Sequence, residues 1–217
     1  MRTLLIDTSC ERGIVAICEG DNVLFKKELS LGQPASQYLV SIIHQGLRDV
    51  LLSAKELQAI VVGRGPGSYT GLRVGAMVAK TLSYALQIPL IGVCGLEALI
   101  PKEDGMFASL IDARMGGAYI AIGKKTGGEV EISTSAKVLP LVDAISLLQE
   151  VEHIVTPCIE PIKSKLEAIG LNSSLWSELG PDILQMLRLA KVQFEKKCFS
   201  LDGSLDLLYL KEWTANS

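Results

Sequence analysis

The sequence predicts an α/β protein with mixed β-sheets, arranged as two related lobes. Two observations support this fold class. In the first half, short apolar segments typical of strands and longer segments with helical spacing follow in the order βββαβαβ, which suits helices layered on a mixed sheet. A pattern that begins at Leu4 then recurs near Ser109, and an internal repeat of this kind indicates a duplicated architecture.

The elements of the first half are marked by apolar spacing and by glycine breaks. Three short strands are expected at residues 3–7, 14–19 and 22–29, separated by Gly13 and the turn at 20–22. A helix is expected at 36–52, where apolar residues recur at helical spacing. A buried strand at 59–63, a helix at 70–86 and a strand at 90–94 complete this half. The second half shows helices around 140–149, 159–168 and 180–196.

The repeat places five residues of the first lobe on identical residues of the second at a constant offset of 105. They are Leu5, Ile6, Asp7, Ala16 and Ile17, which match Leu110, Ile111, Asp112, Ala121 and Ile122. A match this short can also arise by chance. The polar breaker cluster at 101–105 predicts a boundary between lobes 1–101 and 102–217. The C-terminal helix and the apolar tail "LDLLYLKEW" are candidates to pack back on the first lobe.

Composition and charge exclude several classes of protein. The formal net charge of −3 argues against unaided nucleic-acid binding. Five scattered cysteines without a C-x-x-C pair indicate reduced thiols in the core of a cytoplasmic protein. The N-terminus has no signal-peptide pattern, and no apolar run approaches the ~20 residues of a membrane span, so no membrane association is expected.

The glycine-rich segment "VVGRGPGSYTGLRVG", at residues 61–75, follows a strand and opens a helix, where an anion can be held. It matches neither the Walker A loop nor the dinucleotide G-x-G-x-x-G pattern. The segment is therefore interpreted mainly as a turn at 65–67, with Ser68 or Thr70 capping the helix. An anion resting there stays an alternative.

The two helices of the first half carry more apolar surface than a sheet covers on one side. Between residues 70 and 86 the only charges are Arg73 and Lys80, and Gly71, Gly75 and Ala79 form a small-residue stripe. This pattern predicts a subunit interface. Its residues are Leu39, Ile42, Ile43 and Gly46 on the first helix and Gly71, Leu72, Arg73, Gly75, Ala76 and Ala79 on the second. The alternative is that the second lobe covers both helices.

Residues 63–75 resemble the signature of the bacterial TsaB family (older name YeaZ), the non-catalytic subunit of the machinery that makes threonylcarbamoyladenosine on tRNA. "LLIDTS", "IDARMGGAY" and "LLYLK" are similar to further family segments, in order along the chain. One departure is Ala35, where relatives often carry His.

The resemblance implies an actin-like ATPase (ASKHA, ribonuclease H-like) fold of two duplicated lobes. It also implies a nucleotide cleft whose phosphates would face Asp7, Thr8 and Ser9 in one lobe and Asp112, Ala113 and Arg114 in the other. Gly65, Gly67 and Ser68 of the glycine segment would border this cleft. The implied partners are a TsaD-like paralogue that performs the transfer and a TsaE-like ATPase, with tRNA reached only through the complex.

Three classes of activity make different demands on the residues of the chain. A metal-dependent transferase or peptidase needs clustered ligands, and the chain has only His44 and His153, so no metal site is expected. An ATP hydrolase could use Asp7 and Asp112 on a metal–nucleotide and Arg114 on phosphate, although the aspartates could equally cap turns. A binding scaffold needs only the apolar surface, and this interpretation is preferred.

The sequence therefore predicts a scaffold subunit without catalytic residues of its own. It requires no cofactor, with ATP or ADP and Mg²⁺ as an option that the sequence does not demand. On its own the chain could pair with a second copy through the same surface.

Overall fold

The computed structural model of the chain describes residues 1–29, 35–114, 116–160, 162–171 and 175–210. The chain forms two compact units, and the first is discontinuous in sequence. It contains Met1–Gly95 and Pro181–Leu208, and the second contains Leu96–Gly180 together with Tyr209 and Leu210 among the described residues at the end of the chain. The division at Gly95 lies slightly before the predicted boundary, because the short 3₁₀ turn Leu96–Ala98 packs on strands of the second unit.

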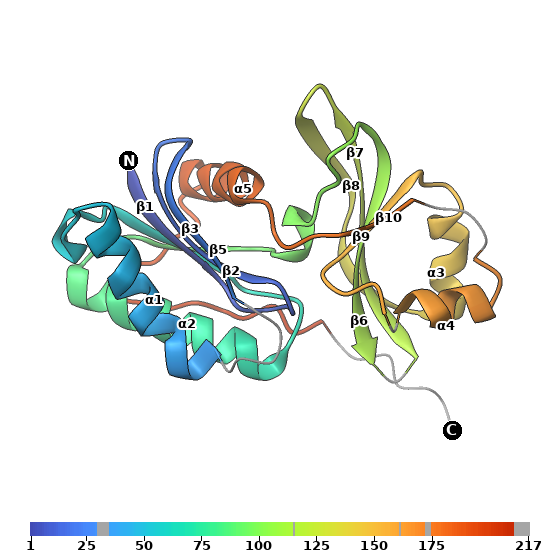
Figure 1. Ribbon diagram of the computed structural model, residues 1–217, viewed down its shortest axis with the longest axis horizontal. Coiled ribbons are helices and arrows are strands. Elements are labelled where there is room, and N and C mark those ends of the chain that lie inside the picture. Colours follow the sequence, from blue (N-terminus) through green and yellow to red (C-terminus); the bar gives the residue numbers. More distant parts are fainter. Residues whose placement is uncertain (30–34, 115, 161, 172–174, 211–217) are drawn as a thin grey trace. The chain divides into compact units, whose positions relative to one another are not determined.

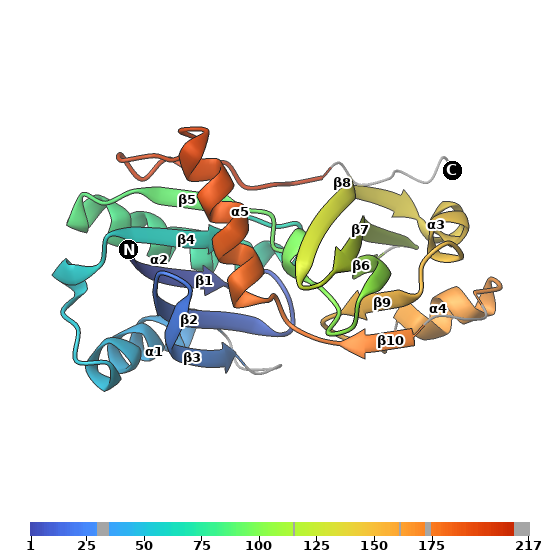
Figure 2. The same ribbon diagram turned by 90° about the horizontal axis from the view of Figure 1, so that it is seen from above.

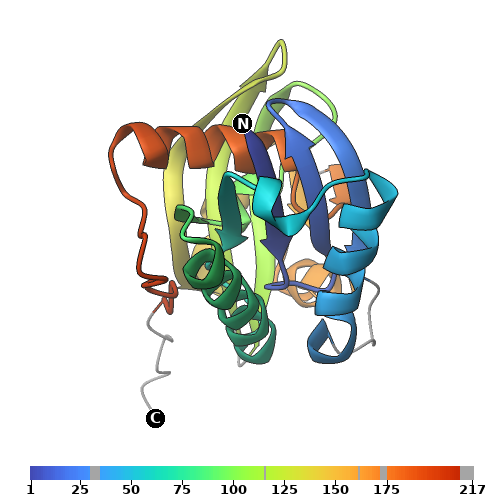
Figure 3. The ribbon, with the colours of Figure 1, turned by 90° about the vertical axis from the view of Figure 1, so that its left-hand side faces the viewer.

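The first unit is a five-stranded mixed sheet in the order β3-β2-β1-β4-β5. Its strands are β1 (Arg2–Asp7), β2 (Gly13–Glu19), β3 (Asn22–Leu29), β4 (Ala59–Gly63) and β5 (Leu90–Val93). β1 pairs antiparallel with β2 and parallel with β4. Helices α1 (Ala35–Asp49) and α2 (Tyr69–Leu86) lie on one face, and α5 (Ile183–Glu195) lies on the other (Figures 1 and 3). The predicted βββαβαβ order is confirmed.

The sequence accounts for these elements locally. Every residue of β4 is buried, as expected for a central strand covered on both faces. Ser68 caps the start of helix α2, where its hydroxyl accepts a bond from the Gly71 N–H at 3.3 Å, and Gln87 caps the end in the left-handed conformation. Of the two cap candidates in the sequence, Ser68 and Thr70, the cap is Ser68.

The second unit repeats this arrangement, in the order β8-β7-β6-β9-β10. Its elements are β6 (Gly105–Arg114), β7 (Gly117–Thr126), β8 (Glu129–Pro140), α3 (Leu141–Leu148), β9 (His153–Thr156), α4 (Ile162–Ala168) and β10 (Leu175–Glu178). β6 pairs antiparallel with β7 and parallel with β9, as β1 does with β2 and β4. Residues of α3 and α4 share a core with β6 and β7. The predicted duplication of the lobes is confirmed at the level of topology.

After β10 the chain returns to the first unit. Helix α5 packs on β5 and β4, and Figure 2 shows it crossing that sheet. The chain then runs beside β5, where Leu90 and Ser200 exchange two backbone hydrogen bonds, and the Leu208 N–H reaches the Arg64 carbonyl at 2.8 Å. The C-terminal helix thus packs on the first lobe, as the sequence suggested. Residues 211–213 of the apolar tail lie outside the described residues.

Among the described residues, no helix combines the length and apolarity that crossing a membrane would need.

Candidate functional site

The turn after β1 is buried. Asp7, Thr8 and Ser9 expose no more than 6% of their surface. The Ser9 N–H donates to Asp7 Oδ1 at 2.7 Å, whereas Asp7 Oδ2 and Ser9 Oγ find no hydrogen-bond partner among the residues that the structure describes. Burial raises the pKa of the Asp7 carboxyl, because removing water disfavours its charged form. This turn is therefore part of the core of the first unit.

The glycine segment packs against this turn. The Ser68 N–H donates to the Ser9 carbonyl at 2.6 Å, and the Thr8 hydroxyl donates to the Gly71 carbonyl at 2.7 Å. A Cβ added at Gly67, Gly71 or Gly75 would lie closer than 3.0 Å to an atom of Ser9 or Thr8. The two helix positions, Gly71 and Gly75, have no room for a side chain, because the turn of the same chain occupies the space beside them.

Two further glycines make room for the same turn, and the sequence did not single them out. A Cβ at Gly63 or at Gly95 would lie closer than 3.0 Å to Asp7 Oδ2. Gly63 ends β4 and Gly95 follows β5, so the carboxyl ends of both parallel strands make room for the Asp7 side chain. The available signal was a glycine at or just beyond the end of each of two apolar strands.

The first-unit half of the predicted nucleotide cleft does not fit a bound phosphate. Asp7 is fully buried, and the Ser68 N–H, which an anion at this helix start would use, already binds Ser9. Gly65 and Gly67 have φ angles of 105° and 155°, which favour glycine, so both are needed for the shape of the turn. The packing interpretation of the segment accounts for these contacts.

The second-unit half holds Asp112 and Arg114 at the end of β6. The Arg114 N–H donates to Asp112 Oδ1 at 2.8 Å, and Lys165 of α4 binds Asp112 Oδ2 at 2.7 Å. Arg114 has a φ of 62°, at an irregularity in the pairing of β6 with β7. Asp112 thus fixes the local backbone and pairs with a lysine that the sequence did not single out.

Asp7 and Asp112 differ in orientation: the Asp112 side chain points to the face of its sheet that carries α3 and α4, whereas the Asp7 side chain points away from the face of its sheet that carries α1 and α2. In β1, Ile6 belongs to the helix-facing core, so Asp7 points to the other face. In β6, Leu110 is the helix-facing residue, and Asp112 shares its face and reaches Lys165 on α4. The odd offset of 105 therefore aligns residues of opposite orientation, and the expected equivalence of these aspartates is wrong.

The predicted interface residues need a correction, because most of them face inward. The side chains of Leu39, Ile43, Leu72, Ala76 and Ala79 are no more than 4% exposed. Leu39, Ile43 and Ala79 belong to the core that the helices share with the sheet of the first unit. Gly46 is buried beside the Phe25 ring, Gly71 and Gly75 face Thr8, and Ile42 packs on the same core. Of the ten predicted residues, Arg73 is exposed. A partner would have to contact other side chains.

The outer face of α2 carries large exposed side chains instead. Tyr69, Met77 and Tyr84 are 55%, 66% and 65% exposed. Together with Arg73 they follow helical spacing along one side, and the Arg73 guanidinium lies over the Tyr69 ring at 4.0 Å from its centroid. These four residues are called the α2 stripe below.

The remaining candidate side chains are separate from this stripe. His44 is exposed on α1, and the buried His153 lies 3.3 Å from the Asp104 carbonyl. Within the described ranges no three His, Cys, Asp or Glu residues are grouped as a metal site would require. All five cysteines are free, and they range from buried Cys18 to exposed Cys198, so the expected core placement holds only for some of them.

The duplicated five-stranded sheets, each with three antiparallel strands followed by two parallel ones, place the chain in the class of proteins with the actin-like ATPase fold. Two solved structures from Pseudomonas aeruginosa share the fold: a protein described as similar to peptidase YEAZ (TM-score 0.82, 23% identity, 97% of this chain and 99% of that one) and YeaZ (TM-score 0.77, 22% identity, 96% and 99%).

Sequence comparison identifies the family within this class. Residues 33–201 match the family model described as "TsaD: tRNA N6-adenosine threonylcarbamoyltransferase". Two relatives are named "tRNA threonylcarbamoyladenosine biosynthesis protein TsaB". The one from Bacillus subtilis (strain 168) is 33% identical over 187 residues, covering 85% of this chain and 77% of the relative. The one from Escherichia coli (strain K12) is 34% identical over 199 residues, covering 88% and 80%. The chain belongs to the TsaB family, as its motifs indicated.

Proposed function

We propose that this chain takes part in threonylcarbamoyladenosine formation on tRNA as a non-catalytic subunit in the cytoplasm. Its partner would be a TsaD-like transferase, assisted by a TsaE-like ATPase. The names of its relatives support the pathway. The closed turn at Asp7 supports a scaffold over an ATP-hydrolysing enzyme, because phosphoryl transfer needs exposed groups that contact phosphate.

The α2 stripe is the observation that carries the proposed pairing. Tyr, Met and Arg are enriched at protein interfaces, and central aromatic residues often dominate their energetics. Burying one such apolar side chain is worth about 1.5–3 kcal/mol before the losses of association are subtracted. The helix backbone beneath the stripe is held rigidly, because Gly71 and Gly75 pack on the Thr8 turn. Pairing would therefore need little ordering of the helix.

The net charge of the chain is consistent with tRNA contacts that are made mainly by the partner. A formal charge of −3 disfavours binding of tRNA phosphates by this chain alone. A second copy of this chain could occupy the same stripe when the transferase is absent.

The test is reconstitution of threonylcarbamoyl transfer to tRNA by the TsaD-like paralogue, with and without this chain. We expect Met77→Glu and Tyr84→Glu to weaken the association by about tenfold or more in analytical ultracentrifugation, because each buries a charge in an apolar contact. Val142, a 64% exposed residue of α3, provides the matched control Val142→Glu. Transfer that is independent of this chain, or full pairing by both α2 variants, would contradict the proposal.

A further inference from the structure

Two oxygens of the Asp7 turn are buried without partners. Asp7 Oδ1 accepts from the Ser9 N–H, which leaves Asp7 Oδ2 and Ser9 Oγ without a hydrogen bond to any residue that the structure describes. Both oxygens are inaccessible to water. Buried polar atoms of native proteins almost always have a partner, so this pair of atoms requires an explanation.

The two oxygens border the same small space. A Cβ added at Gly95 would lie within 3.2 Å of both Asp7 Oδ2 and Ser9 Oγ, and a Cβ at Gly63 would meet the Asp7 carboxyl from the other strand end. Because no water reaches either oxygen, the group that joins them is smaller than a water molecule. A proton on Asp7 Oδ2 meets this condition, since a neutral carboxyl group donates one hydrogen bond and a serine hydroxyl can accept it.

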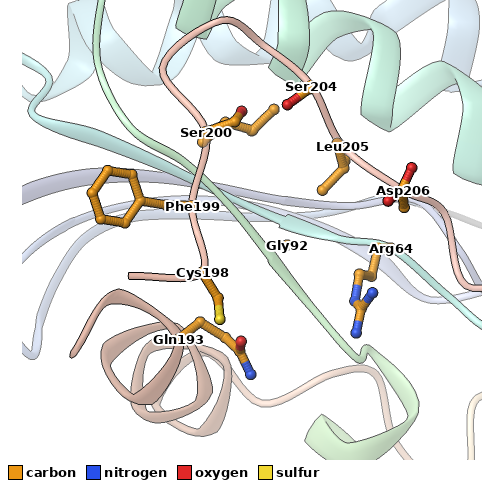
Figure 4. Close-up of a pocket in the computed structure, with 10 residues that line it drawn as sticks. Arg64, Gly92, Gln193, Cys198, Phe199, Ser200, Ser204, Leu205 and Asp206 are labelled. Carbon is orange, nitrogen blue, oxygen red and sulfur yellow. The ribbon is translucent and has the colours of Figure 1, made fainter. Parts of the chain in front are cut away.

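Within the described part of the chain, no cation compensates a charge on the Asp7 carboxyl. Arg64 follows Gly63 directly, but Figure 4 shows its side chain beside β5, in a groove that it lines with Gln193 and other residues. Burial is the largest cause of the raised pKa of Asp7, and a buried carboxylate without a cation is strongly unfavourable. The other titratable groups on the adjoining segments are Cys10, Glu11 and Arg12 on the turn, Cys94 before Gly95, and Arg73 on the outer face of α2.

The Asp7 turn holds the start of α2. The Ser9 carbonyl accepts from the Ser68 N–H at 2.6 Å, and the Thr8 hydroxyl donates to the Gly71 carbonyl at 2.7 Å. Both bonds join the turn to the cap and first turn of the helix, where the α2 stripe begins. A displacement of Ser9 therefore reaches the first turn of α2 directly.

We propose that Asp7 is a proton-dependent lock on the start of α2. In the locked form Asp7 carries a proton on Oδ2 and donates it in a hydrogen bond to Ser9 Oγ, after a small rotation of the Ser9 side chain. Loss of this proton to solvent breaks the bond and leaves a carboxylate that only water can stabilise, so the turn opens and the first turn of α2 loses its support. The lock is a property of the free chain, so it can fail while the proposed pairing through α2 holds.

The test is amide hydrogen exchange of the full chain by NMR from pH 4 to pH 7, expressed as protection factors so that the intrinsic pH dependence of exchange is removed. Because the open turn releases one proton, the protection of the Ser68 and Leu72 N–H groups should fall by about tenfold per pH unit between 3.8 and the folded-state pKa of Asp7. The Ile88 N–H exchanges through fraying of the opposite end of α2, so its protection should stay constant. An equal fall at both ends of the helix, or no fall at its start, refutes the lock.

Variants assign the effect to Asp7 and to its bond with Ser9. Asp7→Asn keeps a neutral side chain that can donate to Ser9 Oγ, so the protection of Ser68 should no longer depend on pH. Asp143→Asn, at an exposed position of α3, is the matched control and should keep the original dependence.

Ser9→Ala removes the hydroxyl that accepts from the neutral carboxyl group, so the pKa of Asp7, followed by the ¹³C signal of its carboxyl carbon, should fall. The same hydroxyl would lower the pKa of Asp7 if it donated to the charged form instead, and its removal would then raise the pKa. A rise in Ser9→Ala, or a pKa of Asp7 at or below 3.8 in the original chain, overturns the proposed bond.

Discussion

Alanine substitutions at Gly71 and Gly75 measure how closely α2 packs on the Asp7 turn. Alanine is favoured over glycine inside a helix by about 1 kcal/mol. Overpacking a core opposes this by about 1–3 kcal/mol. At Gly75 the added Cβ meets Thr8 Oγ1, which can rotate away, so we expect a net loss of about 0–2 kcal/mol. At Gly71 it meets the Thr8 carbonyl, which cannot rotate, so the loss should be about 2 kcal/mol or more.

A double-mutant cycle with Thr8→Ala separates the two contacts. Alone, Thr8→Ala loses the hydroxyl bond to the Gly71 carbonyl and about 1 kcal/mol. In the Thr8→Ala background the clashing Thr8 Oγ1 is absent, so adding Gly75→Ala should be neutral or stabilising. The coupling free energy between the two substitutions should be about 1–2 kcal/mol. Combined with Gly71→Ala, Thr8→Ala leaves the clashing carbonyl in place, so the two losses should nearly add.

Urea unfolding followed by circular dichroism gives these free energies, provided that both midpoint and slope are compared. The reasoning is refuted if Gly71→Ala is no less stable than Gly75→Ala, or if Thr8→Ala leaves the loss at Gly75 unchanged. The close contact with Thr8 also determines what is expected of Gly75→Leu. The sequence alone predicts that it abolishes pairing and leaves the chain folded, whereas the contact with Thr8 predicts that it destabilises the first unit itself.

Two further predictions concern titratable groups. Because burial raises the pKa of Asp7 above its ordinary value of 3.8, the folded state holds a proton that the unfolded state loses, and stability should fall as pH rises from about that value through the folded-state pKa. Asp7→Asn should flatten this fall in urea unfolding between pH 4 and 7, and an unchanged slope would show that Asp7 is not responsible. Exposed Cys198 should react with a thiol reagent at pH 8 well before buried Cys18, whose pKa burial raises to about 11. Mass spectrometry of partly labelled chain checks the order, and faster labelling at Cys18 would contradict it.

The sequence predicted the elements of the first half well because apolar spacing and glycine breaks report local structure. It also predicted the duplication, although from a repeat in the wrong register, and it did not identify strands β8 and β10. The strand at 59–63 coincides with β4, and the predicted helix at 70–86 differs from α2 by one residue at its start. These features depend on periodicity and on short segments, which a single sequence displays. The sequence assigned the C-terminal helix to the second lobe, with packing on the first lobe as an option, whereas α5 belongs to the first unit.

The site was harder to predict because it depends on which face a residue occupies. The stripe of Gly71 and Gly75 indicates a close backbone approach, but the pattern does not say whose backbone approaches, and here it is the Thr8 turn of the same chain. The match of Asp7 with Asp112 ignored the alternation of side chains along a strand. Lys165 and Gly95 entered the site only through tertiary contacts that are distant in sequence.

The discontinuity of the first unit has a consequence for its synthesis. Helix α5 covers the sheet formed by residues 1–95, yet it leaves the ribosome only after residues 96–180 have been made. At about 5–20 residues per second, one face of that sheet stays uncovered for roughly 4–17 s. The segment 96–180 is continuous and contains every strand of the second unit, so the nascent chain can form the second sheet before α5 covers the first one.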